Sequence, residues 1–278
     1  MTMLLCFDGP IYKQLAETAP KDVICLPMDK KDFKDIVAKM KFSTEYEKEH
    51  IIFVMGDLQR IKPLFDIVSP SFYFKQFKKV TMIFPDGAKP QWRKPLEQLS
   101  TLADKVIRMD TFNEHGCYLP INQWFWYSGT NKDIDFAFYG ATGIYPERKR
   151  TIEYLRENGI SIQHQFMQDM MEALRRTKVT LNFGNCLSGD TDQRKWQIKG
   201  RVWEAAMAKC VVIEPRNPET VKIFTDDEIV WYDDMKELPS LVNLLMNDYC
   251  RCESLADRAF DKAKQYADPS IYWERLLN

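Results

Sequence analysis

Histidine is scarce in this sequence, and its scarcity limits the kinds of site to expect. Only three histidines occur among 278 residues, His50, His115 and His164, and they are too dispersed to suggest a metal triad. The seven cysteines are an odd number, scattered and mostly in apolar surroundings. Cys250 and Cys252 form a C-x-C pair with no second pair and no histidine nearby. We therefore expect reduced, buried thiols in a cytoplasmic protein rather than a metal centre.

Long hydrophobic runs are missing as well. No apolar stretch approaches the ~18 residues of a transmembrane helix. The opening MTMLLCFDGP has a short apolar run without the basic segment or small-residue cleavage site of a signal peptide, so we expect a first strand there. The net charge is −1, which gives no overall attraction to nucleic acid or to an acidic membrane. The net charge does not exclude a local basic patch on the surface.

Short apolar runs alternate with amphipathic stretches along the whole chain. The runs that look like strands lie at 3–7, 22–27, 50–56, 79–85, 105–109, 133–140, 161–165, 178–184, 210–215 and 228–234. Such alternation is typical of βα units and of parallel sheets. We therefore predict an α/β protein with two Rossmann-like domains facing a cleft. The join between them is expected near 111–132, which is rich in turn formers and aromatics.

The segment DFAFYGATGIYPERKR contains a candidate anion site. Gly140 and Gly143 follow an expected strand and precede an expected helix, where the backbone can approach a phosphate near the helix N-terminus. Their spacing is not G-x-G-x-x-G, and an ordinary strand–turn–helix glycine explains them equally well. Arg148, Lys149 and Arg150 fall in the first helical turn, where cations oppose the helix dipole. Two interpretations of these three cationic residues stay open: they bind a phosphate, or they form a solvated basic face.

A second polar cluster surrounds the stretch KGRVWEAAMAKCVVIEP. Asn182 lies in the expected strand VTLNF, where a polar side chain needs a partner. Beyond the loop 184–200, Lys199 and Arg201 flank an expected helix start and together suit a diphosphate, Lys as a point charge and Arg as a fork. Glu204 suits both hydroxyls of a ribose, since a carboxylate only accepts hydrogen bonds. It also suits a capping box, with Arg201 as its surface partner.

Four segments in order resemble the C-terminal half of the GT-B glycosyltransferases, above all the CgeB-like branch of group 1. They are YLPINQWFW, DIDFAFYGATGIYPERKR, LRRTKVTLNF and KGRVWEAAMAKCVVIEP. The likeness covers 117–235, whereas the N-terminal half matches only in its order of elements. It implies an acceptor-side domain, 1–118, and a nucleotide-sugar domain, 119–278. It also implies that Tyr272 and Trp273 pin the last helix back on the first domain.

The resemblance implies a metal-independent hexosyltransferase without a cofactor, whose donor is a nucleoside-diphosphate sugar, most simply a UDP-sugar. Carried over by position, Glu204 binds the ribose, and Arg201 and Lys199 lie near the diphosphate. Gly140 lets the first loop approach the donor, and Arg148 is a phosphate ligand. Asn182 belongs to the same nucleotide-sugar site.

Two positions depart from the family pattern. Many group 1 enzymes have another glutamate eight residues before the ribose-binding one, near the donor sugar, and Trp196 stands there in this chain. The donor sugar and the stereochemistry therefore stay open. The glycine that usually follows E-A-x-A-x is replaced by Lys209, a change that we expect to concern only a helix end.

The N-terminal half offers acids that follow expected strands. Asp86 is the preferred catalytic candidate because it follows the most strand-like run, and Asp8 with Gly9 is the acceptor-side candidate. Asp57 is a further possibility, although each D-G pair is first of all a turn signal. An inverting enzyme needs a general base, whereas a retaining one can let the leaving phosphate assist, and both remain open. No D-x-D stands at a strand end, so we predict no required metal.

The acceptor and two other functions remain open. Glycan, protein and modified DNA bases are all candidate acceptors, and FYFKQFKK at 72–79 interleaves aromatics and cations as polymer-binding segments do. An ordinary solvated face is the simpler interpretation of that segment. His115 and the aromatics at 124–127 lie in the join, where packing is the simpler role. A sugar-nucleotide epimerase or phosphorylase on the same scaffold, or a non-catalytic nucleotide-sugar-binding module, are the alternative functions.

Overall fold

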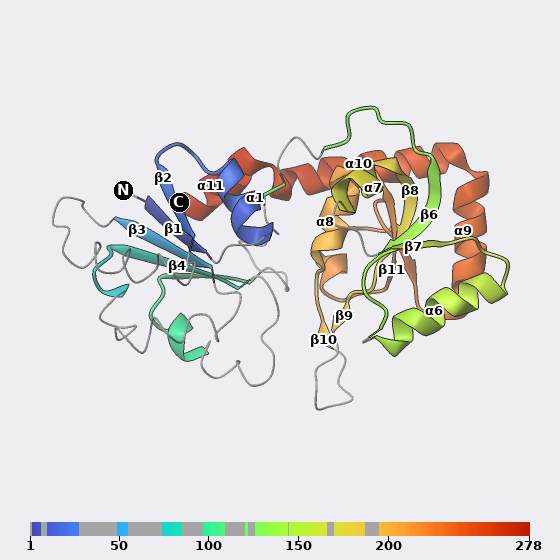
Figure 1. Ribbon diagram of the computed structural model, residues 1–278, viewed down its shortest axis with the longest axis horizontal. Helices are drawn as coiled ribbons and strands as arrows, with labels where there is room; N and C mark the ends of the chain where they lie inside the picture. The colour runs from blue at the N-terminus through green and yellow to red at the C-terminus, as the bar shows by residue number, and fades with distance from the viewer. Residues whose placement is uncertain are drawn as a thin grey trace. The chain divides into compact units, whose positions relative to one another are not determined.

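The structure, a computed structural model, describes residues 2–6, 10–27, 49–54, 74–84, 97–108, 120–121, 126–143, 145–165, 170–186 and 195–278. The chain divides into two units. The first comprises Met1–Pro120 with Tyr272–Asn278, and the second comprises Ile121–Ile271. Each unit contains a five-stranded sheet whose strands are all parallel (Figure 1). The predicted α/β class is confirmed.

The sheet of the first unit has the strand order β2-β1-β3-β4-β5. Its strands are β1 (Thr2–Cys6), β2 (Val23–Pro27), β3 (His50–Val54), β4 (Lys79–Phe84) and β5 (Lys105–Arg108). Strands β3 and β4 are mostly apolar apart from His50, Lys79 and Thr81, as expected for inner parallel strands that are covered on both faces. Ile51, Ile52 and Phe53 are fully buried, and the Phe53 ring packs edge-on against Phe74 at 5.6 Å between centroids. Helix α1 (Pro10–Thr18) connects β1 to β2.

The last helix, α11 (Pro269–Leu277), brings the end of the chain to the first unit. Trp273 is buried and its indole N–H donates to the Thr18 hydroxyl of α1 at 3.2 Å. The Lys79 ammonium group at the start of β4 donates to the carbonyl of Leu277 at 3.0 Å. A cation is favourable there because the carbonyls at a helix C-terminus carry partial negative charge. The final turn of the chain therefore stabilises a sheet made by its first half.

The sheet of the second unit has the order β12-β11-β8-β6-β7. Its strands are β6 (Ile134–Tyr139), β7 (Gln163–Gln165), β8 (Thr177–Leu181), β11 (Val211–Pro215) and β12 (Val230–Tyr232). Two short antiparallel strands, β9 (Asn185–Cys186) and β10 (Lys195–Trp196), were not expected. Because β8 ends at Leu181, Asn182 follows the strand and does not lie within it, although its N–H still donates to Ile213 of β11 at 2.8 Å.

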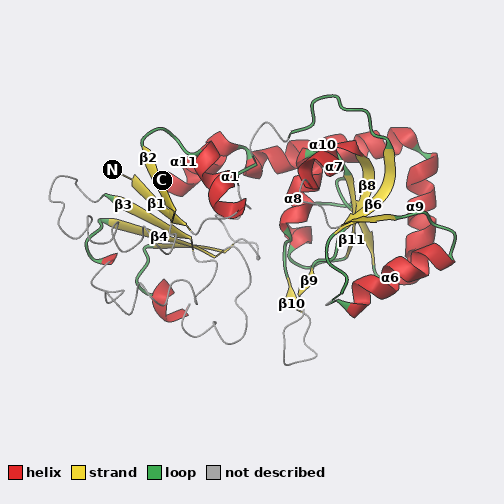
Figure 2. Ribbon diagram, in the orientation of Figure 1, coloured by secondary structure: helices red, strands yellow, loops and turns green. Residues whose placement is uncertain are grey.

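Helices cover both faces of the second sheet, with α7 and α8 on one face and α6 on the other (Figure 2). The helices are α6 (Pro146–Glu157), α7 (Met170–Arg176), α8 (Gly200–Met207), α9 (Leu238–Asn247) and α10 (Tyr249–Ala267), with single 3-10 turns at Thr220–Lys222 and Met235–Glu237. Between the sheet and helices α6, α9 and α10 lies a core that includes Phe136, Leu181, Ile213 and Leu255. In the described part of the chain, no helix is long and apolar enough to cross a membrane.

Helix α8 ends at Met207, and Lys209, the residue that replaces the family's glycine, follows its C-cap Ala208. The N–H of Lys209 donates to Ala206 at 2.9 Å and that of Cys210 donates to Ala205 at 2.8 Å, the two bonds of a Schellman motif. Lys209 has φ 51°, a left-handed conformation that costs a side chain about 1 kcal/mol. Its ammonium group pairs with Asp257 at 2.6 Å and lies over two aromatic rings. The departure at Lys209 thus concerns a helix end.

Candidate functional site

The residues singled out in the second half of the sequence gather at the carboxyl edge of the second sheet. Gly140 follows β6, Asn182 and Gly184 follow β8, and Glu214 lies near the end of β11. These three strands are neighbours and run in the same direction, so their ends meet. In open parallel sheets this edge is where ligands bind.

Gly140 is the point at which the first loop and helix α8 approach each other. A Cβ atom at Gly140 would lie 2.9 Å from the ring tip of Phe138 and 3.5 Å from a guanidinium nitrogen of Arg201. Glycine at this position therefore leaves room for the Phe138 ring, and Arg201 lies at ordinary contact distance from the same point. The ring of His164 stacks on Phe138 at 5.5 Å, and its Nε2 lies 2.9 Å from the Gly140 carbonyl oxygen. His164, to which we assigned no role from the sequence, thus holds this loop.

The three cations at the start of α6 differ in their surroundings. Arg148 is half-buried, donates to the carbonyl of Ala141 at 3.3 Å and lies over the Tyr145 ring at 3.8 Å from its centroid. Lys149 and Arg150 are exposed on the outer side of the helix. The solvated basic face therefore describes Lys149 and Arg150, whereas Arg148 folds back over the first loop.

Glu204 is not a capping residue, so that interpretation is wrong. Helix α8 begins at Gly200, which makes Glu204 its fifth residue, and the cap at Lys199 has no side-chain hydrogen bond. The Glu204 side chain is only 12% exposed, and its Oε2 lies 3.9 Å from Nε of Arg201. Burial raises the pKa of Glu204, and the neighbouring Arg201 opposes that rise. A largely buried carboxyl and a guanidinium thus lie one turn apart at the carboxyl edge.

The segment before α8 is held by its backbone. The N–H of Gln197 donates to the Gly184 carbonyl at 2.7 Å, and the Asn217 amide donates to the Gln197 carbonyl at 2.8 Å. The Lys199 ammonium group donates to the side-chain oxygen of Gln197. Lys199 is therefore tied to the ends of β8 and β11 through Gln197.

Glu214 is the buried acid that the sequence reasoning missed. It has no exposed surface, and its Oε1 accepts from the amides of Asn182 at 2.9 Å and Asn217 at 3.2 Å. Burial raises the pKa of Glu214 to about 7. Hydrogen bonds to Asn217, Thr220 and Asn182 oppose this rise, and so does the positive charge of Lys199. Its signal in the sequence is an acid at the end of the apolar run CVVIEP, where a charged side chain needs partners.

Several predicted residues lie outside the described part of the chain. These are the catalytic candidate Asp86, the acceptor-side pair Asp8 and Gly9, and also Asp57 and His115. Their roles stay predictions.

The segment at 72–79 is described from residue 74, and the two aromatics in its described part are buried. Phe74 is 2% exposed and Phe77 is 8% exposed, so both belong to the core of the first unit. Core packing therefore accounts for these two rings, and they do not form a stacking surface for a polymer. From the join, Trp126 donates to the Ile121 carbonyl at 3.0 Å and packs edge-on against Phe260 of α10.

A cavity of about 1050 Å³ lies at the opposite, amino edge of the second sheet. Lys132, Lys178 and Lys209 are among its lining residues, and none of the predicted nucleotide-sugar residues lines it. Lys132 is occupied there by the carbonyls that end α7 and α8. Among the described residues, no three His, Cys, Asp or Glu side chains form a metal-binding group, and the need for a metal stays untested.

A family model described as glycosyl transferase-like matches residues 123–278, more than half of the chain. No curated protein matches the sequence at a significant level. The GT-B architecture predicted from the sequence is confirmed by solved structures that cover 99% of the chain.

Three of these structures illustrate the likeness. HepE of Anabaena, solved with UDP and glucose, has a TM-score of 0.62 and 11% identity over 98% of its own chain. An alpha-glucosyltransferase solved with UDP and DNA containing an HMU base has a TM-score of 0.56 and 12% identity over 98% of its chain. A glycosyltransferase of Rickettsia africae has a TM-score of 0.54 and 10% identity over 88% of its chain. At such identities the likeness concerns the fold.

Proposed function

The chain belongs to the glycosyl transferase-like family, and we propose that it transfers a hexose from a UDP-sugar to a hydroxyl group of an acceptor. The observation that carries the proposal is the pair formed by Glu204 and Arg201 on α8, facing the Gly140 loop at the carboxyl edge of the second sheet. A largely buried carboxyl with one cationic neighbour suits the two hydroxyls of a ribose, which donate to it. The donor is assigned to the second unit and the acceptor to the first.

The donor's diphosphate is assigned to three cations. Arg201 offers a planar fork to phosphate oxygens, and Lys199 a compact charge. Arg148, which folds over the first loop, supplies a third group near the start of α6, where the helix dipole also favours an anion. Together these groups take the place that a metal ion holds in other sugar transfers, and chelation by EDTA is expected to leave transfer unchanged.

Transfer joins the acceptor oxygen to the anomeric carbon and breaks the bond from that carbon to the terminal phosphate oxygen. The acceptor loses a proton, and the departing diphosphate gains negative charge. Lys199 and Arg201 stabilise that charge more strongly as it develops, which is how fixed cations lower a barrier. Asp86 follows β4 in the sequence and is the proposed base for the acceptor proton.

Donor binding tests the proposal first. UDP and UDP-glucose are expected to raise the melting temperature, because a ligand that binds only the folded state stabilises it. Glu204→Ala is expected to weaken UDP binding roughly 10- to 100-fold, the effect of losing hydrogen bonds to a charged group. Glu157→Ala is the matched control, since Glu157 is an exposed acid at the far end of α6. The proposal fails if no nucleoside diphosphate or sugar nucleotide binds.

Transfer is tested by mass spectrometry of the products from a panel of sugar nucleotides and mixed acceptors. Glycans, proteins and DNA with hydroxymethylated bases form the acceptor panel. Asp86→Asn is expected to lower kcat while leaving the affinity for UDP-glucose unchanged. Isomerisation of the sugar nucleotide without any acceptor would identify an epimerase instead. Tight donor binding without transfer to any acceptor would identify a binding module.

A further inference from the structure

We propose that Glu214 is a positioning residue of the donor site, which sets the place of the Lys199 ammonium group through Asn217 and Gln197. The inference rests on the proposed function, because it concerns the cation assigned to the diphosphate. Glu214 itself does not touch the donor in this scheme. It acts on the segment that presents Lys199.

A continuous chain of hydrogen bonds leads from Glu214 to Lys199. The Asn217 amide donates to Glu214 at 3.2 Å and to the Gln197 carbonyl at 2.8 Å, so one side chain joins the acid to the segment before α8. The N–H of Glu219 donates to the Asn217 side-chain oxygen at 3.0 Å, which fixes the orientation of that amide. Gln197 in turn accepts from Lys199. The step from Asn217 to Gln197 joins two segments that are distant in the sequence, and the other steps are local.

The residues of this chain are buried and closely packed. Glu214 and Asn217 are fully buried, and Asn182 and Gln197 are each 4% exposed. A Cβ atom at Gly184 would lie 2.3 Å from the Asn217 amide nitrogen and 2.6 Å from Glu214 Oε1. Moving Asn217 would remove the amide donor that both Glu214 Oε1 and the Gln197 carbonyl share, so the contacts at Asn217 restrain the segment before α8.

The charge of Glu214 distinguishes positioning from ordinary packing. Lys199 is the charged group that acts on its carboxyl, and the other groups around it are the neutral side chains of Asn182, Asn217 and Thr220. With a pKa of about 7, the carboxyl is protonated below that pH and ionised above it. A diphosphate bound at Lys199 disfavours the ionised form, so donor binding is expected to take up a proton. The affinity for the donor is therefore higher at pH 6 than at pH 8.

The test measures the affinity for UDP-glucose by calorimetry between pH 6 and pH 8. UDP-glucose is chosen because both of its phosphates are esterified and neither titrates in this range. Glu214→Ala is expected to weaken binding about tenfold, because the Asn217 and Asn182 amides lose their acceptor. Glu214→Gln retains an oxygen acceptor without the charge, so it is expected to restore the affinity and to remove the part of its pH dependence that Glu214 contributes, while the part due to Glu204 stays.

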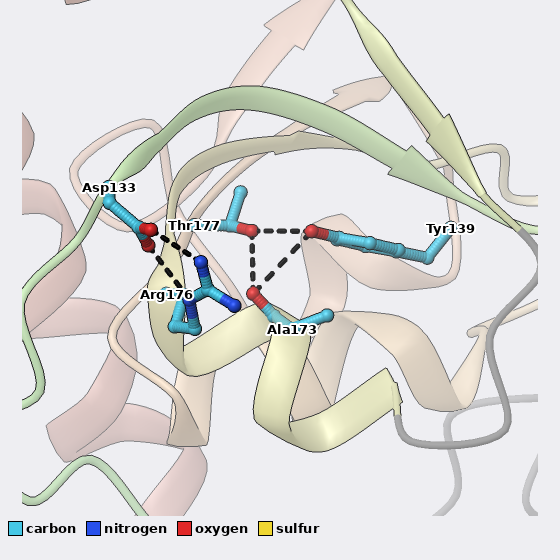
Figure 3. A network of polar contacts seen from close by, with 5 residues as sticks. All are labelled: Asp133, Tyr139, Ala173, Arg176 and Thr177. Carbon is cyan, nitrogen blue, oxygen red and sulfur yellow. Dashed lines mark hydrogen bonds and ion pairs between the residues drawn. The ribbon is translucent and has the colours of Figure 1, made fainter.

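A matched control comes from a second buried polar network of the same sheet (Figure 3). There the Thr177 hydroxyl donates to the Ala173 carbonyl at 2.7 Å and lies 2.7 Å from the Tyr139 hydroxyl. Thr177 begins β8, at the end of the strand that lies away from Asn182. Thr177→Ala is expected to destabilise the fold without changing the affinity for UDP-glucose or its pH dependence.

The outcomes separate the inference from the function on which it rests. If the wild-type protein binds no UDP-glucose at any pH, the proposed function fails and the inference fails with it. If the wild-type protein binds but Glu214→Ala binds equally well, only the inference is overturned. If Glu214→Ala does not fold, Glu214→Gln still decides, because an unchanged pH dependence in that variant contradicts the assignment.

Discussion

The two units share a five-stranded parallel sheet but bury different titratable groups at opposite edges. In the first unit His50, at the start of β3, is 5% exposed and its Nε2 lies 2.8 Å from the Thr81 hydroxyl. In the second unit Glu214, near the end of β11, is fully buried and linked to two amides. Burial and the charges of Lys79 and Lys105 lower the pKa of His50 to about 4, whereas burial raises that of Glu214 to about 7.

The contrast shows where a buried titratable group has a structural role and where it serves the proposed site. His50 bridges two neighbouring strands and stays neutral at ordinary pH, as a core residue does. Glu214 connects the ends of β8 and β11 to the segment that precedes α8. The loops that carry the proposed donor residues leave the carboxyl edge of the second sheet and must be held in place. None of the proposed donor residues lies at its amino edge. The following predictions test this difference.

The largest expected effect is a loss of stability in the second unit as the pH rises. Because the pKa of Glu214 is raised from 4.5 to about 7 in the folded state, the folded unit holds a proton that the unfolded chain releases. The free energy of unfolding should fall by about 3 kcal/mol between pH 4.5 and pH 7, since one pKa unit corresponds to about 1.4 kcal/mol. Hydrogen exchange of the second unit measures it. Glu214→Gln should reduce the slope and leave only the part that the raised pKa of Glu204 contributes, and a slope as steep as that of the wild type would contradict the assignment.

The second-largest expected effect on stability comes from replacing a glycine that packs against the same network. Gly184→Ala places a Cβ atom against Asn217 and Glu214, and overpacking of this kind costs about 2 kcal/mol. Gly143→Ala is the matched control, because a Cβ atom there meets nothing within 4 Å. Denaturant titration of both variants measures the difference. Equal stabilities would show that the carboxyl-edge network can rearrange.

The first unit should respond to pH in the opposite direction and to a smaller extent. The lowered pKa of His50 means that the unfolded chain binds a proton which the folded unit excludes, so the first unit loses stability as the pH falls from 6.5 towards 4. The loss should be smaller because His50 begins its strand, where local relaxation admits water. Hydrogen exchange of β3 and β4 follows the effect. His50→Gln should flatten it, and a first unit that is more stable at pH 4 than at pH 6.5 would break the comparison.

The smallest effect concerns the end of α8. Lys209→Gly relieves the left-handed strain but loses the pair with Asp257, so its stability should stay within about 0.5 kcal/mol of wild type. Lys209→Ala keeps the strain and loses the pair, and should be about 1 kcal/mol less stable than Lys209→Gly. Thermal unfolding compares the two. Neither variant should change UDP-glucose affinity, because Lys209 lies at the amino edge.

Much of the architecture follows from local patterns in the sequence. The apolar runs of β3, β4 and β6 are long enough to predict strands, and their alternation with amphipathic stretches predicts parallel sheets. The sequence also places Lys199, Arg201 and Glu204 at the start of one helix. Strands β9 and β10 were not predicted because a strand of two residues is too short to show an alternating hydrophobic pattern. The capping interpretation of Glu204 failed because the start of α8 could not be located to within one turn.

The sequence alone determined the class of the fold and the segments that hold the proposed donor residues, because strand and helix periodicity is a property of each element by itself. Only the tertiary structure decided that Glu214 meets Asn182 and Asn217, and that His164 holds the Gly140 loop. These contacts join residues from different elements. They depend on the order and register of parallel strands, which no local pattern records. The acid that the structure adds to the site was therefore visible in the sequence only as a charge in an apolar run.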